Sequence, residues 1–224
     1  MIEAVLWDVD DTIFDFTGSE RTGLLSHFEA EGLPTGEAEL ARWHRITETA
    51  RRDLAAGRLT YDEYRRGRVR TFVDRPLSDI DADAWHDRYE ALFEAAWSAF
   101  PDAAPALDAL PYRQGILSNS TTVHQERRLT ALGLRHHFEV LLCSDRLGCA
   151  KPDPQAFLAA CAALESPPAR VAYVGDKLDV DAEGARNAGL HAVWLDRAGT
   201  AAPTPAGIHR IPALTGLSAL LAAC

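Results

Sequence analysis

The segment Asp8-Val9-Asp10-Asp11-Thr12 places three carboxylates within four residues, close to the start of the chain. It directly follows the apolar run from Ile2 to Trp7, which is typical of a buried strand. Crowded carboxylates at the end of such a strand repel one another and lose hydration, and a hard divalent cation offsets both effects most simply. The sequence therefore predicts a metal-dependent site in this segment.

Three later segments also carry reactive or polar groups where a short apolar run ends or shortly after it. They are Ser118-Asn119, Gly148-Cys149-Ala150-Lys151-Pro152 and Gly175-Asp176-Lys177-Leu178-Asp179-Val180-Asp181. In open parallel sheets, ligands bind beyond the carboxyl ends of the strands, so segments far apart in sequence converge there. We expect all four segments to build one site.

The combined groups fit phosphoryl transfer. One carboxylate can attack phosphorus and form an acyl phosphate, while Mg²⁺ and an ammonium group neutralise the charge of the transferring group. A second carboxylate can protonate the leaving oxygen and then activate water. A hydroxyl and an amide can bind the phosphoryl oxygens. The predicted cofactor is Mg²⁺, and the predicted partner is a small-molecule phosphate ester.

The elements that must position these groups follow a strand-helix rhythm. Five apolar runs of strand length lie at residues 4–7, 115–117, 140–143, 171–174 and 192–195. Helical spacing covers residues 123–132 and 157–164, with Asp153-Pro154 as an N-cap followed by proline, and a further helix begins near Asp179 and stops at Gly189. This pattern predicts an α/β fold, a doubly wound parallel sheet with right-handed crossovers.

Residues 17–99 have helical periodicity without convincing strands, and they predict a smaller, all-helical domain inserted into the sheet domain. The periodic residues are Leu40, Trp43, Thr47, Ala50 and Leu54, and then Trp85, Tyr89, Leu92, Phe93 and Ala96. The expected catalytic core is therefore residues 1–16 with 100–224. We expect the tryptophans and tyrosines of the insertion to form its core. Its many arginines are expected to form a solvated face: Arg51, Arg52, Arg65, Arg66, Arg68 and Arg70.

In this order, the four segments resemble the motifs of the haloacid dehalogenase-like (HAD) hydrolase superfamily. The match consists of Asp8-x-Asp10-x-Thr12, Ser118 after a hydrophobic strand, Lys151-Pro152, and Gly175-Asp176 with Asp181 five residues beyond Asp176. The motif-bearing core covers roughly residues 1–16 and 100–200. The helical insertion resembles the cap of the phosphatase type, which lies between the first and second motifs, in position and periodicity only.

The resemblance implies a role for each matching residue. Asp8 would be the nucleophile and a metal ligand, and Asp10 the general acid and base, with its carbonyl also on the metal. Thr12 would orient Asp10. Ser118 and Asn119 would hold the phosphoryl oxygens, and with Thr12 they make up the implied substrate-binding residues.

Two further motifs complete the implied site. Lys151 would neutralise Asp8 and the phosphoryl group, and Asp176 would complete the Mg²⁺ site. Asp181 would order a metal-bound water from the second shell of ligands. Lys177 departs from the small hydroxyl residue often found at this position in similar proteins, and a cation there would pair with Asp181 or tune the metal site.

Several alternatives stay open. Asp11 and Asp179 are expected to cap helices or face solvent, so we exclude both from the site. Superfamily members that cleave carbon-halogen bonds typically lack the second aspartate, so Asp10 favours a phosphatase over a haloacid dehalogenase. A phosphomutase needs the same catalytic set, and a catalytically silent binding protein would be expected to show a broken motif.

In the insertion, Arg21, His27, Arg45 and Arg58 are weak candidates for substrate contacts and are better explained as surface residues.

The composition narrows the class of partner. The 224 residues contain 33 Asp and Glu against 23 Lys and Arg, a net charge of −10, which disfavours nucleic acid or an anionic membrane as the main partner. No export signal or membrane-spanning run is visible, and Cys143, Cys149, Cys161 and Cys224 lack the spacing of a disulfide scaffold or a CxxC motif. We expect a cytoplasmic protein that acts as a monomer or homodimer.

Overall fold

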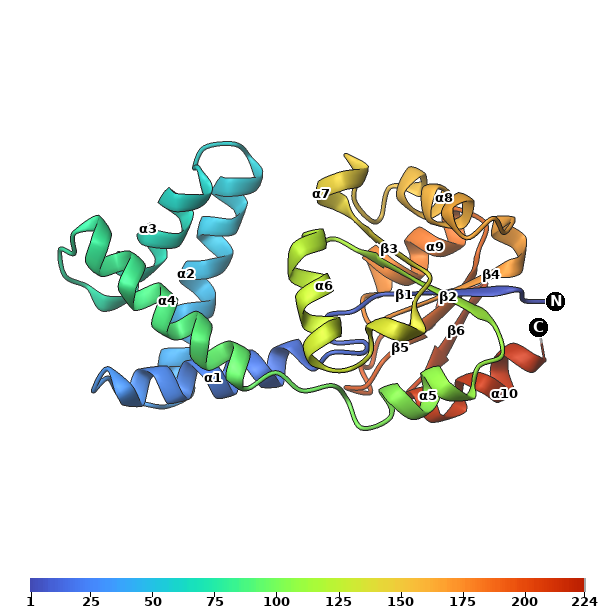
Figure 1. Ribbon diagram of the computed structural model, residues 1–224, viewed down its shortest axis with the longest axis horizontal. Coiled ribbons are helices and arrows are strands. Elements are labelled where there is room, and N and C mark those ends of the chain that lie inside the picture. The colour runs from blue at the N-terminus through green and yellow to red at the C-terminus, as the bar shows by residue number, and fades with distance from the viewer. Residues whose placement is uncertain (224) are drawn as a thin grey trace. The chain divides into compact units, whose positions relative to one another are not determined.

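A computed structural model describes residues 1–223, apart from the side chain of Ala55. Its central element is a sheet of parallel strands in the order β3-β2-β1-β4-β5-β6 (Figure 1). The strands are β1 (Ala4–Trp7), β2 (Arg113–Ser118), β3 (Val140–Cys143), β4 (Val171–Gly175), β5 (His191–Leu195) and β6 (Ile208–Ile211). The predicted doubly wound α/β fold is therefore confirmed.

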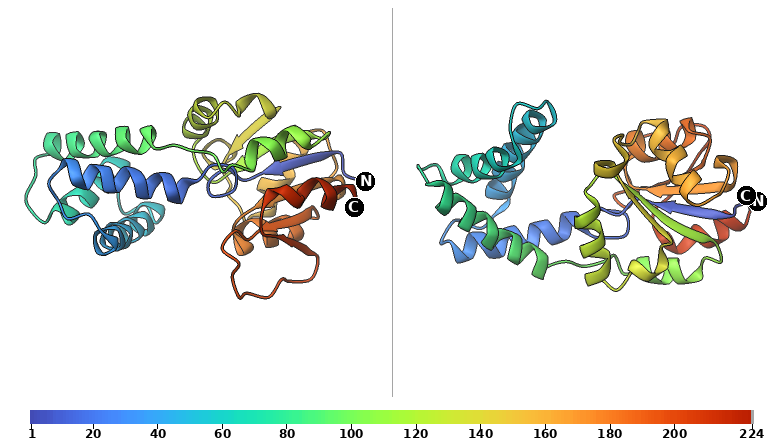
Figure 2. Two further views of the ribbon diagram at one scale, coloured as in Figure 1. Left: turned by 90° about the horizontal axis from the view of Figure 1, so that it is seen from below. Right: turned by 45° about the horizontal axis from the view of Figure 1, so that its top comes forward.

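The central strands are apolar because both faces of the sheet are covered. Every residue of β1 and β4 is buried, and α8 and α9 cover one face while α5 and α10 cover the other (Figures 1 and 2). The helices of this unit are α5 (Ala103–Ala109), α6 (Thr122–Ala131), α7 (Ser144–Leu147), α8 (Pro154–Ala163), α9 (Glu183–Asn187) and α10 (Leu217–Ala222). The predicted cap of α8 is present, since the Asp153 carboxylate accepts from Gln155 N at 2.9 Å.

Two features of the sheet unit differ from the sequence prediction. β6 was not predicted, because its sequence Ile-His-Arg-Ile alternates apolar and polar residues at the edge of the sheet instead of forming an apolar run. The helix expected from about Asp179 begins as a π-helical turn, Leu178–Ala182, which continues into α9. Gly189, the predicted stop, has a left-handed φ of 86°.

The chain divides into two compact units, of which the helical one spans Phe16–Trp97. The other unit contains Met1–Asp15 and the chain from Ser98 onward. The chain leaves the sheet unit after Asp15 and returns to it at Ser98. These two points lie side by side, because the Asp15 N–H donates to Ser98 O at 3.0 Å.

The helical unit consists of α1 (Phe16–Ala30), α2 (Glu37–Ala55), α3 (Tyr61–Val73) and α4 (Asp79–Ala95). Helix α1 packs on α4, and α3 packs on both α2 and α4. The α1 and α4 backbones come so close that a Cβ on Gly23 would lie 2.6 Å from Phe93 Cα. Buried Trp43, Trp85 and Tyr89 form the core of this unit, as their periodicity predicts.

The arginines of α3 do not share one environment. Arg65, Arg66 and Arg70 form ion pairs with aspartates of α4. Arg68 is only 7% exposed, so the prediction of a solvated face is wrong for this residue.

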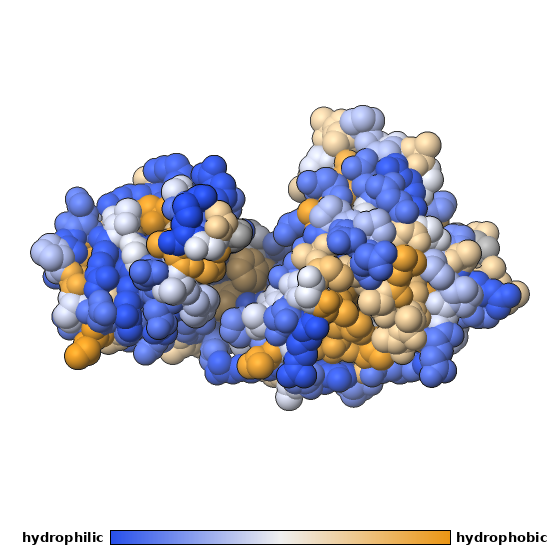
Figure 3. Space-filling model, turned by 90° about the horizontal axis from the view of Figure 1, so that it is seen from above, coloured by the Kyte–Doolittle hydropathy of each residue, from blue (hydrophilic) through white to orange (hydrophobic). Residues whose placement is uncertain are grey.

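On the face shown in Figure 3, hydrophilic residues cover much of the surface, and apolar areas lie between them. Between residues 1 and 223, no helix combines the length and apolar character needed to span a bilayer. Cys143 and Cys161 are buried free thiols and Cys149 is a partly buried one, whereas Cys224 lies outside the described residues.

Candidate active site

Four segments of the sheet unit meet near the ends of β1, β2 and β4. Asp8 follows β1, and its N–H donates to Val174 O at 2.9 Å, which continues the pairing of β1 with β4. The chain then turns tightly, since the N–H groups of Ile13 and Phe14 both donate to Val9 O, at 3.0 and 2.9 Å. This turn keeps the first carboxylates close to the strand end.

Lys151 connects the segments through its ammonium group, which is buried. Its Nζ donates to Asp8 Oδ1 at 2.6 Å, to Asp181 Oδ1 at 2.7 Å and to the Tyr173 hydroxyl at 2.6 Å. An ammonium has three protons, so these contacts use all of them. Burial lowers the pKa of Lys151, but Asp8 and Asp181 outweigh burial and raise the pKa above its ordinary value. Lys151 is therefore a fixed positive charge.

Tyr173 was missed by the sequence analysis, although a phenol in an otherwise apolar strand was a usable signal. It is fully buried in β4 and lies at hydrogen-bonding distance of Asp181 Oδ1 (3.0 Å) and Leu117 O (3.2 Å). Its hydroxyl accepts from Lys151 and donates to one of these two oxygens. It thereby helps to fix the lysine.

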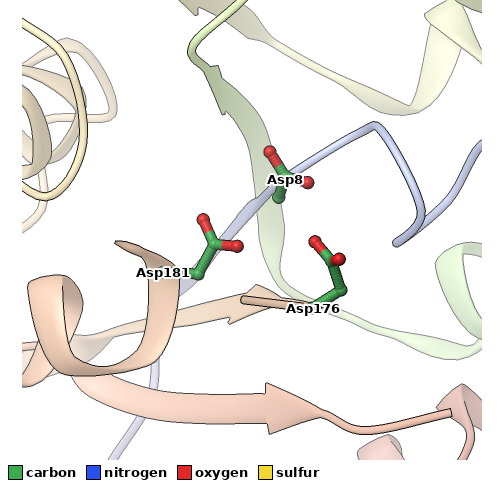
Figure 4. Close-up of side chains that lie close together, drawn as sticks. All are labelled: Asp8, Asp176 and Asp181. Carbon is green, nitrogen blue, oxygen red and sulfur yellow. The ribbon is translucent and has the colours of Figure 1, made fainter. Parts of the chain in front are cut away.

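Three carboxylates converge beside this lysine, as Figure 4 shows for Asp8, Asp176 and Asp181. One carboxylate oxygen from each lies within 4.8 Å of the others. Burial raises the pKa of Asp8 to about 8, with Lys151 opposing the shift and Asp181, Asp176 and Asp10 adding to it. Burial and then Asp181 raise the pKa of Asp176 to about 7. The cluster holds more negative charge than Lys151 balances.

The donor set fits a hard divalent cation. Asp176 Oδ1 is buried without a hydrogen-bond partner, whereas both Asp181 oxygens already accept, Oδ1 from Lys151 Nζ and Oδ2 from Lys177 N. An unpartnered buried carboxylate oxygen is costly unless a cation binds it. Gly175 makes room for this arrangement, because a Cβ there would lie 2.5 Å from Asp181 Cγ.

Asp10 points to a different set of partners on α6. Arg128 Nη1 donates to Asp10 Oδ1 at 2.8 Å, and Gln125 Nε2 donates to Asp10 Oδ2 at 3.0 Å. Burial raises the pKa of Asp10, while Arg128 and Gln125 oppose the shift. Sequence reasoning missed both partners, although two polar residues spaced i, i+3 on the helix after β2 were a signal.

The role implied for Thr12 is not what the structure shows. Its buried hydroxyl donates to Asp8 Oδ2 at 3.4 Å, a long contact, and Asp10 is oriented by α6 instead. The tight turn after Val9 explains the difference, because it directs Thr12 back toward Asp8.

Ser118 and Asn119 lie at the end of β2 with different surroundings. Ser118 Oγ is buried and accepts from Gln125 Nε2 at 3.0 Å and from Ser120 N at 3.2 Å. The Asn119 side chain donates to Lys151 O and accepts from Lys151 N, both at 2.8 Å. The amide side chain therefore holds the lysine backbone, and the Asn119 backbone is the part left to bind a ligand.

The neighbouring charged residues stay outside the cluster. Asp11, at a left-handed φ of 63°, is not one of the three converging carboxylates, and Asp179 is exposed and accepts from Val180 N. Lys177 contacts Asp181 through its backbone N–H at 3.0 Å, so the suggested side-chain ion pair with Asp181 is wrong. Its charge instead lowers the pKa of Asp176, against the larger effects of burial and Asp181.

Arg21, His27, Arg45 and Arg58 of the helical unit were weak candidates for substrate contacts. Each has surroundings that need no substrate to explain them. Arg21 pairs with Glu37 and Arg58 with Asp53, both at the surface, and Arg45 is exposed. His27 is fully buried, with its ring 4.2 Å from that of Trp85, so its interpretation as a surface residue is wrong.

Comparison with known proteins matches residues 2–189 to the haloacid dehalogenase-like hydrolases. Among curated relatives, a glyceraldehyde 3-phosphate phosphatase of Methanopyrus kandleri is 31% identical over 88% of this chain and 85% of its own length. A pyrimidine 5'-nucleotidase of Escherichia coli is 26% identical over 86% of this chain and 85% of its own.

Solved structures share the fold. A HAD-hydrolase of Bacillus subtilis bound to magnesium aligns with a TM-score of 0.80, 24% identity and 99% coverage of both chains. An L-2-haloacid dehalogenase of Xanthobacter autotrophicus aligns with a TM-score of 0.74, 22% identity and 99% coverage of both. These likenesses show the fold alone, and the side chains at the strand ends must identify the chemistry.

Proposed function

We propose that this chain, which belongs to the haloacid dehalogenase-like hydrolase family, is a Mg²⁺-dependent phosphatase. It hydrolyses a small phosphorylated metabolite, a nucleotide or sugar phosphate, through an aspartyl-phosphate intermediate. The observation that carries the proposal is the 2.6 Å contact of Lys151 Nζ with Asp8 Oδ1 beside the carboxylates of Asp176 and Asp181.

Asp8 is the nucleophile of the first step. An oxygen of its carboxylate attacks phosphorus, and the bond from phosphorus to the ester oxygen breaks. Lys151 holds the attacking carboxylate in place and offsets the charge of the phosphoryl group. Ser118 Oγ and the Asn119 backbone N–H bind the phosphoryl oxygens.

Asp10 moves the protons. Its protonated carboxyl donates to the departing ester oxygen, so the alcohol leaves neutral. The resulting carboxylate then accepts a proton from water, which attacks phosphorus and breaks its bond to Asp8. Phosphate is released, and both aspartates return to their starting states. Arg128 and Gln125 keep Asp10 oriented through this cycle.

Asp8, Asp176 and the Asp10 carbonyl would hold Mg²⁺, with Asp181 behind them. The bound ion supplies positive charge that offsets the crowded carboxylates and the phosphoryl oxygens. Asp181 fits the supporting position because its two oxygens are already engaged by Lys151, Tyr173 and the Lys177 N–H.

Asp10 favours phosphate esters over haloacids. Carbon-halogen cleavage releases a halide, which needs no proton, whereas an ester oxygen does. A positioned second carboxylate would serve no purpose in dehalogenation. The phosphatase names of the M. kandleri and E. coli relatives support the same choice and favour small phosphate esters. We assign the helical unit, Phe16–Trp97, as the cap that sets specificity.

A phosphate-release screen tests this function. Purified protein is assayed with nucleotides, sugar phosphates and triose phosphates, with Mg²⁺ or with a chelator, and 2-chloropropionate is assayed for chloride release. We expect Mg²⁺-dependent phosphate release and no chloride. Release of chloride without phosphate would identify a dehalogenase, and an isomerised sugar phosphate would identify a phosphomutase.

Asp8→Asn tests the nucleophile and should abolish turnover with the fold retained. Asp11→Asn is the matched control, because it makes the same change three residues away, at a left-handed φ that asparagine tolerates. It should keep activity within about twofold of the unmodified protein. Turnover retained by Asp8→Asn would refute the assignment.

A further inference from the structure

A cavity of about 440 Å³ lies within the helical unit, between α2 and α3. Ile46, Ala50 and Leu59 form apolar parts of its wall, together with the ring of Tyr64. Arg45 and Arg68 bring positive charge to the same cavity. An apolar cavity with a few convergent polar groups is typical of a small-molecule site.

Arg68 is the unusual member of this set because it is buried without a counter-ion. It is 7% exposed, and its Nε has no hydrogen-bond partner. Its polar contact is a long one, 3.5 Å from Nη1 to Thr47 Oγ1, and its guanidinium lies 4.3 Å from the Tyr64 ring centre. Within residues 1–223, no carboxylate pairs with it.

The neighbouring arginines of α3 have the carboxylate partners that Arg68 lacks. Arg65 and Arg66 lie at 2.8 and 2.7 Å from carboxylate oxygens of Asp83 while remaining partly exposed. A buried guanidinium loses more hydration than an exposed one and has a greater need for an anionic partner. The described chain gives the Arg68 guanidinium the rings of Tyr64 and Trp43 but no anion, and the cavity beside it has room for one.

Gly67 provides the space for such a partner. It lies in the interior of α3, where glycine lowers helix stability relative to alanine. A Cβ on Gly67 would meet nothing within 4 Å, so packing does not require glycine here. The missing side chain keeps this wall of the cavity open beside Arg68.

We infer that this cavity binds a small organic carboxylate. The carboxylate would pair with the Arg68 guanidinium, whose planar fork matches it, and the apolar body would lie against Ile46, Leu59 and Tyr64. Asp53 and Glu63 also line the cavity and disfavour a doubly charged phosphate. Both are already engaged, Asp53 by Arg58 and Glu63 by Thr60. This site is independent of the proposed phosphatase chemistry.

Fluorine NMR with 4-fluorobenzoate tests the site on the full chain without any activity assay. The ligand resonance should broaden on addition of protein, whereas that of neutral 4-fluorobenzamide should not. Arg68→Met should weaken binding at least about tenfold, because it removes a charge-assisted pair and keeps the side-chain length. Arg65→Met makes the same change in an ion-paired arginine of α3 and should leave binding unchanged.

Gly67→Leu provides a second test, which decides the question alone if Arg68→Met fails to fold. It fills the cavity from a helical position where a side chain is tolerated, so binding should be lost while the helical content is retained. Binding retained by either folded variant would overturn the site. Equal broadening of the amide, or displacement by inorganic phosphate, would overturn the carboxylate assignment.

Discussion

At the scale of single residues, the contacts of Asp10 separate the general acid from the nucleophile. Lys151 holds Asp8, while α6 holds Asp10 through Arg128 and Gln125. Two carboxylates close in sequence thus face different environments, which is how one site can supply both a nucleophile and an acid.

Arg128→Met should lower kcat roughly tenfold with KM nearly unchanged, because Asp10 loses its 2.8 Å ion pair but the groups that bind phosphate remain. Steady-state kinetics on the best substrate measure both constants. Arg128→Lys should recover part of the loss by restoring the charge. Arg135→Met removes a surface pair with Glu126 and serves as the control. If Arg128→Met and Arg128→Lys lowered kcat equally, Arg128 would not position Asp10 through its charge.

Gly175→Ala should displace Asp181, since the new Cβ would lie 2.5 Å from Asp181 Cγ. We expect a loss of about 1–3 kcal/mol in the free energy of unfolding, together with weaker Mg²⁺ binding. Urea unfolding and Mg²⁺ titration measure the two effects. Gly216→Ala is the matched control, because a Cβ there meets nothing within 4 Å. Equal effects of the two substitutions would refute the steric explanation.

The sequence was more informative about reactive groups than about their supports. Asp8 and Asp176 could be proposed because carboxylates at strand ends have few structural purposes. Gln125 and Arg128 were missed because their contact with Asp10 depends on how α6 packs, which helical periodicity does not specify. The contact of Thr12 with Asp8 could not be predicted for a similar reason, because the direction of its hydroxyl depends on the tight turn after Val9.

At the scale of the elements, the helical unit should lose stability in mild acid. Burial lowers the pKa of His27 from 6.5 to about 4, with a smaller opposing effect of Glu31 and a smaller further lowering by Arg88. Between these pH values the unfolded chain binds the proton and the folded chain does not. The stability is therefore complete above about pH 6.5 and falls as the pH drops toward 4, by about 3 kcal/mol.

His27→Leu should reduce this pH dependence, because leucine has no proton to bind and both ring nitrogens of His27 lack partners, while buried His86, whose pKa burial lowers to about 3, keeps a share of it. Urea unfolding followed by circular dichroism at pH 7.5 and pH 5 measures the difference. His209→Gln changes an exposed histidine of β6 and is the control. An unchanged pH dependence in His27→Leu would show that another group is responsible.

Elements with a strong local pattern were predictable, and those defined by their neighbours were not. β1 was predicted with its observed bounds, because a buried parallel strand reads as an apolar run. β6 alternates polar and apolar residues, since the edge position leaves part of it exposed. The π-helical turn at Leu178–Ala182 has no periodicity of its own, and it places Asp181 beside Lys151.

At the scale of the whole molecule, the acidic cluster implies a conflict between stability and metal binding. Asp176 has a buried oxygen with no partner and a pKa raised to about 7, mainly by burial and then by Asp181. This carboxylate destabilises the metal-free fold and would become favourable when a cation binds. Mg²⁺ should therefore stabilise the whole chain by binding the folded state alone.

Thermal unfolding of the unmodified protein and of Asp176→Asn, each with a chelator and with Mg²⁺, measures this coupling. At a Mg²⁺ concentration about a hundredfold above its Kd, the unmodified protein should gain about 2.7 kcal/mol. Asp176→Asn should be more stable than the unmodified protein in the chelator, because it removes an uncompensated charge, and should gain little from Mg²⁺. Asp179→Asn changes an exposed aspartate of the π-helical turn that follows Asp176 and should keep the full Mg²⁺ effect. If Asp176→Asn is instead less stable in the chelator, the carboxylate contributes to the metal-free fold, and the proposed conflict does not exist.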